Sequence, residues 1–206
     1  MSQLAGEFQR TKVVPEVDAY RISKIAQMTP AANRTVYTPA AGTILKKMQE
    51  DIGAVRDEIG SDEQLVMLVS TPVSTILNTS TELGKKLDVT DFMRGEITTK
   101  VKSLDGVPLL VVPSARMNSR ITLLANGKGG FAKAEGAAAI NYIILPRRAP
   151  IAVSKTDNMR LFDPNTWQKA HAWHMDYRKF HDLWIPKNQL PGIRMSMAAA
   201  DASLAG

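Results

Sequence analysis

The order of helix-like and strand-like segments constrains the fold of this chain more than any other feature of its sequence. Apolar residues recur at helical spacing over residues 3–28 and 43–59. Strand-like patterns follow, including an alternating stretch at residues 96–102 and an apolar run at residues 107–112. The helical and strand patterns do not alternate as they do in β-α-β units, which favours an α+β fold over a doubly wound parallel sheet.

Helix start and stop signals refine these predictions. Thr43 is a plausible N-cap for the helix over residues 43–59, and Gly60 follows as a stop signal. Thr71-Pro72 opens a further helix, with proline at its first position. Pro15 lies inside the first helical pattern, where a missing donor and a steric clash predict a kink or a restart.

The remaining segments divide into strands, connections and a tail. Strands are predicted at residues 65–69, 96–102, 107–112, 140–145, 151–155 and 173–185. Residues 29–39 are predicted to be a linker and residues 125–139 a surface loop, because they hold few groups that can pack. Residues 198–206 are small and polar enough to fray.

Composition excludes several classes of protein. The chain has no cysteine, so disulfides, thiolate nucleophiles and cysteine-based zinc sites are excluded. Its longest apolar run, Val107–Pro113, is far shorter than the roughly 20 residues of a membrane span, and residues 1–10 lack a signal-peptide core. We therefore expect a soluble, cytosolic protein without membrane contact. The net charge of +6 favours anionic partners.

Catalytic and ligand motifs are weak throughout. His171, His174 and His181 could form a metal site, but no His-Glu-x-x-His pattern is present and surface histidines are favoured. Asn126–Gly130 is glycine-rich, yet its Gly-Lys is not followed by serine or threonine, which favours a plain loop over phosphate binding. No serine lies in a Gly-x-Ser-x-Gly elbow, although a Ser/His/Asp site assembled from distant residues stays open. We predict no enzyme activity, metal or cofactor.

One stretch concentrates the large side chains. Residues 160–184 hold six of the twelve Phe, Tyr and Trp residues, including all three tryptophans, and they also hold all three histidines. Aromatic rings beside fixed charges are typical of surfaces that another molecule covers. The cations Arg147, Arg148, Arg160, Arg178 and Lys179 could also bind single-stranded nucleic acid by stacking and phosphate contact. A protein–protein interface is the favoured interpretation.

Four sequence blocks, in order, resemble tailed-phage major capsid proteins. They are Glu7–Arg10 leading to Val13–Arg21, then Val112–Met117, then Leu161–Pro164 with Tyr177–Trp184, and finally Pro191–Ile193. The resemblance implies the Hong Kong 97-type shell fold. It makes residues 1–29 the spine helix of a peripheral domain, residues 30–138 an axial domain, and residues 139–206 the returning peripheral strands. Family members usually carry an N-terminal arm and an extended loop before the spine helix, and this chain is expected to lack both.

The resemblance predicts a structural protein that associates with copies of itself, or with full-length capsid subunits, into a virion shell. The protein would occupy the virion, and the cytoplasm of the bacterial host during assembly. The expected contact residues are Arg160, Trp167, Trp173, Tyr177, Arg178, His181, Asp182 and Trp184. One alternative is a truncated, prophage-encoded capsid protein that defends its host by disturbing the shell of an infecting phage. Another is a nucleic-acid-binding module.

Overall fold

A seven-stranded mixed sheet forms the centre of the molecule in a computed structural model, which describes residues 2–79, 87–94, 97–124, 130–167 and 169–199. In spatial order its strands are β1 (Arg34–Val36), β11 (Arg194–Met197), β8 (Ile140–Pro146), β2 (Leu65–Ser70), β5 (Val107–Val112), β4 (Ile97–Leu104) and β3 (Asp88–Arg94). The β1–β11 and β2–β5 pairs are parallel, and the other four pairs are antiparallel. The α+β prediction is confirmed.

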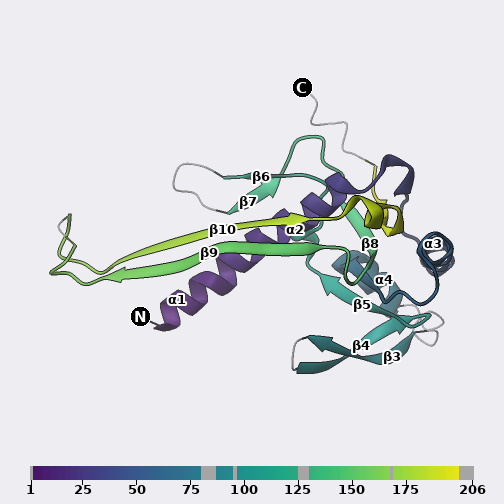
Figure 1. The fold of residues 1–206 in the computed structure, drawn as a ribbon, viewed down its shortest axis with the longest axis horizontal. Coiled ribbons are helices and arrows are strands. Elements are labelled where there is room, and N and C mark those ends of the chain that lie inside the picture. Colours follow the sequence, from purple (N-terminus) through teal and green to yellow (C-terminus); the bar gives the residue numbers. More distant parts are fainter. Residues whose placement is uncertain (1, 80–86, 95–96, 125–129, 168, 200–206) are drawn as a thin grey trace.

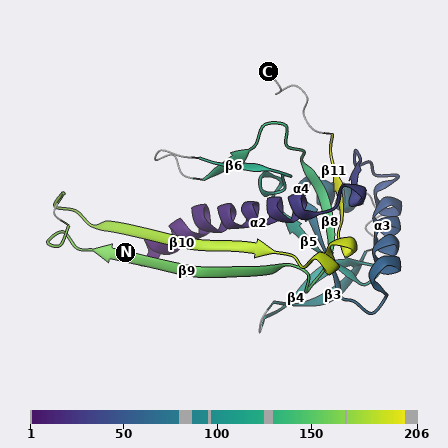
Figure 2. The same cartoon turned by 45° about the horizontal axis from the view of Figure 1, so that its top comes forward.

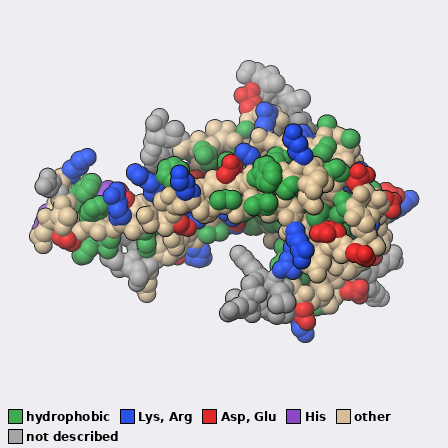
Figure 3. All heavy atoms as spheres, in the orientation of Figure 1, with side chains coloured by type: hydrophobic (Ala, Val, Ile, Leu, Met, Phe, Trp, Pro, Cys, Tyr) green, Lys and Arg blue, Asp and Glu red, His purple; other side chains and the backbone are tan. Residues whose placement is uncertain are grey.

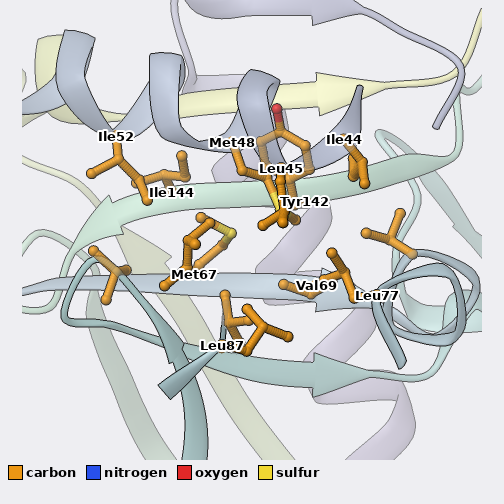
Figure 4. Close-up of a cluster of buried hydrophobic side chains, with 14 of the residues drawn as sticks. Ile44, Leu45, Met48, Ile52, Met67, Val69, Leu77, Leu87, Tyr142 and Ile144 are labelled. Carbon is orange, nitrogen blue, oxygen red and sulfur yellow. The ribbon is translucent and has the colours of Figure 1, made fainter. Parts of the chain in front are cut away.

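Two helices cover one face of this sheet. They are α3 (Ile44–Ile59), close to the predicted residues 43–59, and α4 (Thr71–Thr79), which begins at the predicted Thr71. Figure 4 shows the apolar stripe of α3 lying over the side chains of β2 and β8. The labelled members of this cluster are Ile44, Leu45, Met48, Ile52, Met67, Val69, Leu77, Leu87, Tyr142 and Ile144. Each large apolar side chain buried in this way contributes about 1.5–3 kcal/mol of transfer free energy.

Thr43 occupies the N-cap position of α3, as predicted, but its side chain makes no capping hydrogen bond. Its hydroxyl lies 2.6 Å from the hydroxyl of Tyr37 instead. The stop signal is confirmed, since Gly60 ends the helix with φ +92, a conformation that residues with a Cβ rarely adopt.

The opposite face of the sheet is covered by a long N-terminal helix. It comprises α1 (Ser2–Phe8), a π-helical turn η1 (Gln9–Val13) and α2 (Val14–Met28), which run on as one rod in Figure 1. Ile22 and Ile25 of α2 pack with Ile143 and Leu145 of β8, so β8 is buried along its whole length. The sheet is therefore the middle layer of three.

Pro15 is accommodated within this helix without a break. In η1 the backbone N–H of Val14 donates to the carbonyl of Gln9, five residues back, so the turn before Pro15 is wider than an α turn. Pro15 is the second residue of α2, directly after this wider turn, so its missing N–H falls where the hydrogen-bond register of the helix changes. The predicted restart is thus a π turn followed by a continuous helix.

A buried polar group links α3 to the sheet. Asp51 is only 5% exposed, and it accepts hydrogen bonds from Lys47 at 2.5 Å and from the hydroxyl of Tyr142 at 2.6 Å. Burial, together with the hydrogen bond to Asp51, raises the pKa of Tyr142. The tyrosine therefore stays protonated and remains a donor to the carboxylate.

A long two-stranded hairpin projects from the layered end of the molecule. Its strands are β9 (Ile151–Phe162) and β10 (His174–Trp184), which pair in antiparallel fashion. Figures 1 and 2 show the hairpin running beside α1 and α2 and reaching beyond α1. A shorter hairpin is formed by β6 (Ile121–Leu123) and β7 (Phe131–Lys133). Residues 173–185 were predicted as a strand, and β10 confirms this.

Several other predictions need correction. The linker at residues 29–39 contains a 3-10 turn, η2 (Ala31–Asn33), and strand β1. The loop at residues 125–139 contains β7, while residues 125–129 lie outside the described part, as does the tail from residue 200. The strand at 151–155 continues to residue 162, and β3 was not predicted. The boundary at residue 138 falls within one sheet, because β8 and β11 pair alongside β1 and β2.

Two short 3-10 turns, η3 (Ser114–Arg116) and η4 (Lys187–Gly192), complete the described elements. Arg116 of η3 is tied to α2 by an ion pair with Asp18 at 2.8 Å. Among the described residues, no helix is long and apolar enough to cross a membrane.

Candidate association surface on the long hairpin

Aromatic contacts hold the hairpin against the N-terminal helix. The ring of Tyr177 meets Phe8 of α1 edge-on at 6.0 Å, and the ring of His181 meets Tyr20 of α2 at 5.1 Å. The hydroxyl of Tyr20 also donates to Asp182 at 2.9 Å, and Lys24 lies 3.5 Å from the same carboxylate. Both halves of β10 are therefore attached to the helix.

Hydrogen bonds perturb the acids and phenols along this attachment. Hydrogen bonds from Lys179 and Tyr177 lower the pKa of Asp157. Burial and the bond to Asp157 raise the pKa of Tyr177 to about 12. The backbone N–H of Leu183 and the hydroxyl of Tyr20 lower the pKa of Asp182, so this residue is a carboxylate at neutral pH.

His181 is the least satisfied polar group in this attachment. Its Nδ1 atom is buried and has no hydrogen-bond partner among the described residues. Burial lowers its pKa, and the positive charges of Arg21 and Lys179 lower it further. The imidazole is therefore neutral at pH 7. Protonation at low pH would add a third positive charge beside those of Arg21 and Lys179.

The distal end of the hairpin is organised by one stack of rings. The indole of Trp167 lies parallel to the imidazole of His174, with ring centroids 3.6 Å apart. His174 contacts Asp176 at 2.8 Å, and Arg160 pairs with the same carboxylate at 2.7 Å. The ring of Phe162 lies 6.0 Å from Trp167. These side chains bind one another and fix the end of the hairpin.

A register shift decides which side chains share a face of the hairpin. Thr156 is opposite Phe180, but Ser154 is opposite His181, so β9 holds one extra residue between the two pairs. Successive strand residues point to opposite faces, and the extra residue therefore inverts the alternation of β9. By this alternation the following residues share one face, here called the outer face: Ile151, Val153, Thr156, Asn158, Arg160, Asp176, Arg178, Phe180, Asp182 and Trp184. The carboxylate of Asp182 lies at the edge of this face, since it also reaches Tyr20 and Lys24 of α2.

The outer face is unusually apolar for an exposed ribbon. Four of its large side chains are about half exposed: Ile151 at 43%, Val153 at 55%, and Phe180 and Trp184 at 57% each. Figure 3 shows hydrophobic side chains along the hairpin with cations between them. A contiguous apolar patch rimmed by charges marks an interaction surface.

A hollow of about 360 Å³ adjoins this patch. It is lined by Thr156, Asn158, Arg160, Asp176, Tyr177, Arg178 and Phe180. All but Tyr177 belong to the outer face, so the face offers both raised rings and a depression with two guanidinium groups at its edge.

The predicted contact residues divide between this face and internal packing. Arg160, Arg178, Asp182 and Trp184 lie on the outer face, and Trp173 is 53% exposed just before β10. Trp167, Tyr177 and His181 instead contact other side chains of the same chain. Sequence reasoning missed Ile151, Val153 and Phe180, because their common orientation depends on the extra residue in β9.

The histidines and the basic cluster do not converge on one site. His174 and His181 are seven residues apart on one strand, roughly 23 Å at the rise of a β-strand. In the described part of the chain, no three histidine, aspartate or glutamate side chains could hold a metal ion. Of the candidate nucleic-acid cations, Arg160 pairs with Asp176, Lys179 pairs with Asp157, and Arg147 lies over the ring of Phe92.

Solved structures share this architecture. No protein-family model and no curated protein matches the chain. A structure from Mycobacterium phage Che8 matches 88% of it with a TM-score of 0.50 and 11% identity. The asymmetric unit of the bacteriophage PhiM1 mature capsid matches 89% of it with a TM-score of 0.53 and 15% identity. The chain has a tailed-phage major capsid-like fold.

The match covers only part of each phage protein. The capsid-like chain spans 56% of the length of the Che8 chain and 60% of the PhiM1 chain. The resemblance read from the four sequence blocks is confirmed at the level of fold. The roles of individual residues on the outer face stay predictions.

Proposed function

We propose that this chain is a structural, non-enzymatic capsid subunit that associates with copies of itself in a virion shell. The outer face of the hairpin is the observation that carries the proposal. It presents Phe180 and Trp184 half exposed on a ribbon that leaves the layered end of a capsid-like fold. A subunit gains by burying such a patch against a neighbour, since removing apolar area from water is favourable.

The same proposal assigns the parts of the fold. The rod of α1, η1 and α2 is the spine helix, and with the β9–β10 hairpin it forms the peripheral domain. The seven-stranded sheet with α3 and α4 is the axial domain. The aromatic attachment of the hairpin to the helix supports this grouping, because Phe8 and Tyr20 both contact β10. A rigid peripheral domain of this kind keeps the outer face in one orientation.

Particle formation tests the proposed function. The purified chain, at increasing concentration, is measured by light scattering and viewed by negative-stain electron microscopy. Rings, tubes or shells are expected, either from the chain alone or after mixing with a full-length capsid protein of matching fold. A chain that stays monomeric at every concentration, and that neither joins nor alters the particles of the capsid protein, overturns the proposal.

Interference with another capsid is a second candidate function. The chain matches 56–60% of the two phage chains, so the match extends over only part of their surfaces. If it enters a growing shell, propagation from that position would stop. Co-expression with a full-length capsid protein then lowers the yield of complete particles and leaves the chain bound to the incomplete ones. An unchanged particle yield without co-purification rejects interference.

A further inference from the structure

The outer face of the hairpin is complementary to itself. We propose that two copies of this chain pack their outer faces together about a two-fold axis centred on Phe180, with their β10 strands antiparallel. This inference rests on the self-association proposed above and adds its symmetry and register. A two-fold contact uses the same patch on both subunits, so a residue that precedes the axis meets one that follows it.

The charges nearest the centre are matched in this register. Arg178 and Asp182 lie two residues before and two residues after Phe180 on the same face. Arg178 of one copy therefore faces Asp182 of the other, and the pair occurs twice. The side chain of Asp182 remains 64% exposed although it also accepts from Tyr20, so its carboxylate is accessible to a partner. Opposite charges fix register across an interface.

At the next positions along the strand, the exposed ring of Trp184 faces the hollow beside Asp176 of the other copy. Trp184 and Asp176 lie four residues on either side of Phe180, about 13 Å along the strand in each direction. Trp184 of one copy therefore meets the hollow beside Asp176 of the other. Its indole can rest on Arg160 and Arg178, since guanidinium groups stack on aromatic faces. Tryptophan and arginine are the side chains most often found at the energetic centre of interfaces.

Several other registers on the same face bring like charges together. A parallel arrangement places Arg178 on Arg178 and Asp182 on Asp182. A two-fold axis through Arg178 places that residue opposite Arg178 of the second copy, and an axis through Asp182 likewise places two aspartates opposite each other. The axis at Phe180 puts a large apolar ring on the centre and makes both Arg178–Asp182 contacts attractive. Like charges placed opposite each other suppress wrong pairings.

Charge reversal tests the register directly. Arg178→Asp and Asp182→Arg each place like charges opposite each other, so each variant alone should associate about 30-fold more weakly than the wild type. The double variant exchanges the two charges and should recover association. An equimolar mixture of the two single variants should also recover it, because each then offers the charge that the other lacks. Analytical ultracentrifugation over a concentration series gives the association constants.

Controls separate this inference from the proposed function. Lys46→Asp reverses an exposed charge on α3 and should leave association unchanged, and circular dichroism checks that every variant is folded. Trp184→Ala should weaken association without any rescue by mixing. If the wild type associates and both charge reversals stay within threefold of it, the two-fold register is wrong while self-association stands. If the wild type never associates with itself, the two-fold inference fails, and the proposed function then depends on whether the chain joins the particles of a full-length capsid protein.

Discussion

Replacing Tyr142 with phenylalanine should destabilise this protein more than a loss of one oxygen atom suggests. The side chain of Tyr142 is fully buried, and its hydroxyl donates to Asp51 at 2.6 Å. In Tyr142→Phe, one oxygen of a carboxylate that is 5% exposed loses its donor, while Lys47 still holds the other oxygen. A hydrogen bond to a charged group contributes about 1.5–3 kcal/mol, and a buried acceptor left unpaired adds its desolvation cost.

The expected loss in the free energy of unfolding is therefore about 1.5–3 kcal/mol, which corresponds to a fall in Tm of about 3–12 °C for a chain of this length. Urea denaturation followed by circular dichroism measures it. Tyr37→Phe is the matched control, because its hydroxyl contacts Thr43 in a solvent-exposed hydrogen bond, and it should cost less than about 0.5 kcal/mol. A Tyr142→Phe protein as stable as the control would refute the reasoning.

Two further predictions concern the pH dependence of stability and the packing around a buried glycine. Because burial and Arg21 lower the pKa of His181 in the folded state, the unfolded state binds more protons, and the free energy of unfolding should fall as the pH drops below about 6.5. His181→Phe should flatten this slope in urea titrations at several pH values, and an unchanged slope contradicts the assignment. Gly192→Ala should cost about 1–3 kcal/mol, since its Cβ would lie 2.7 Å from Ile59, whereas Gly6→Ala meets nothing within 4 Å and should stabilise α1. Thermal unfolding compares the two, and equal effects would contradict the steric argument.

The buried elements were the predictable part of the fold. The apolar stripe of α3 and the apolar run of β8 both result from burial, and such patterns can be recognised in the sequence. β9 has no such apolar pattern because nearly all of its side chains are exposed. The predicted strand therefore ended at residue 155 instead of residue 162. The short strands β1 and β7 hold three residues each, too few to show any period.

Composition gives the position of the candidate surface along the chain, but it does not give the orientation of the side chains. The aromatic and basic content of residues 160–184 pointed to the hairpin, and the resemblance to capsid proteins pointed to the fold. Composition cannot tell an aromatic ring that packs inward, such as Tyr177, from one that stays exposed, such as Phe180. That distinction depends on which face of β10 packs against α1 and α2, and this contact joins segments far apart in the sequence.

The π turn η1 sets the rotational phase of the long helix. Phe8 and Tyr20 are twelve residues apart, and an uninterrupted α-helix would turn the second away from the first by about 120°. The wider turn absorbs one residue, which reduces the mismatch to about 20°. Both rings therefore face β10, where they meet Tyr177 and His181. The attachment of the hairpin to the helix at both Phe8 and Tyr20 thus depends on the one residue that the π turn absorbs.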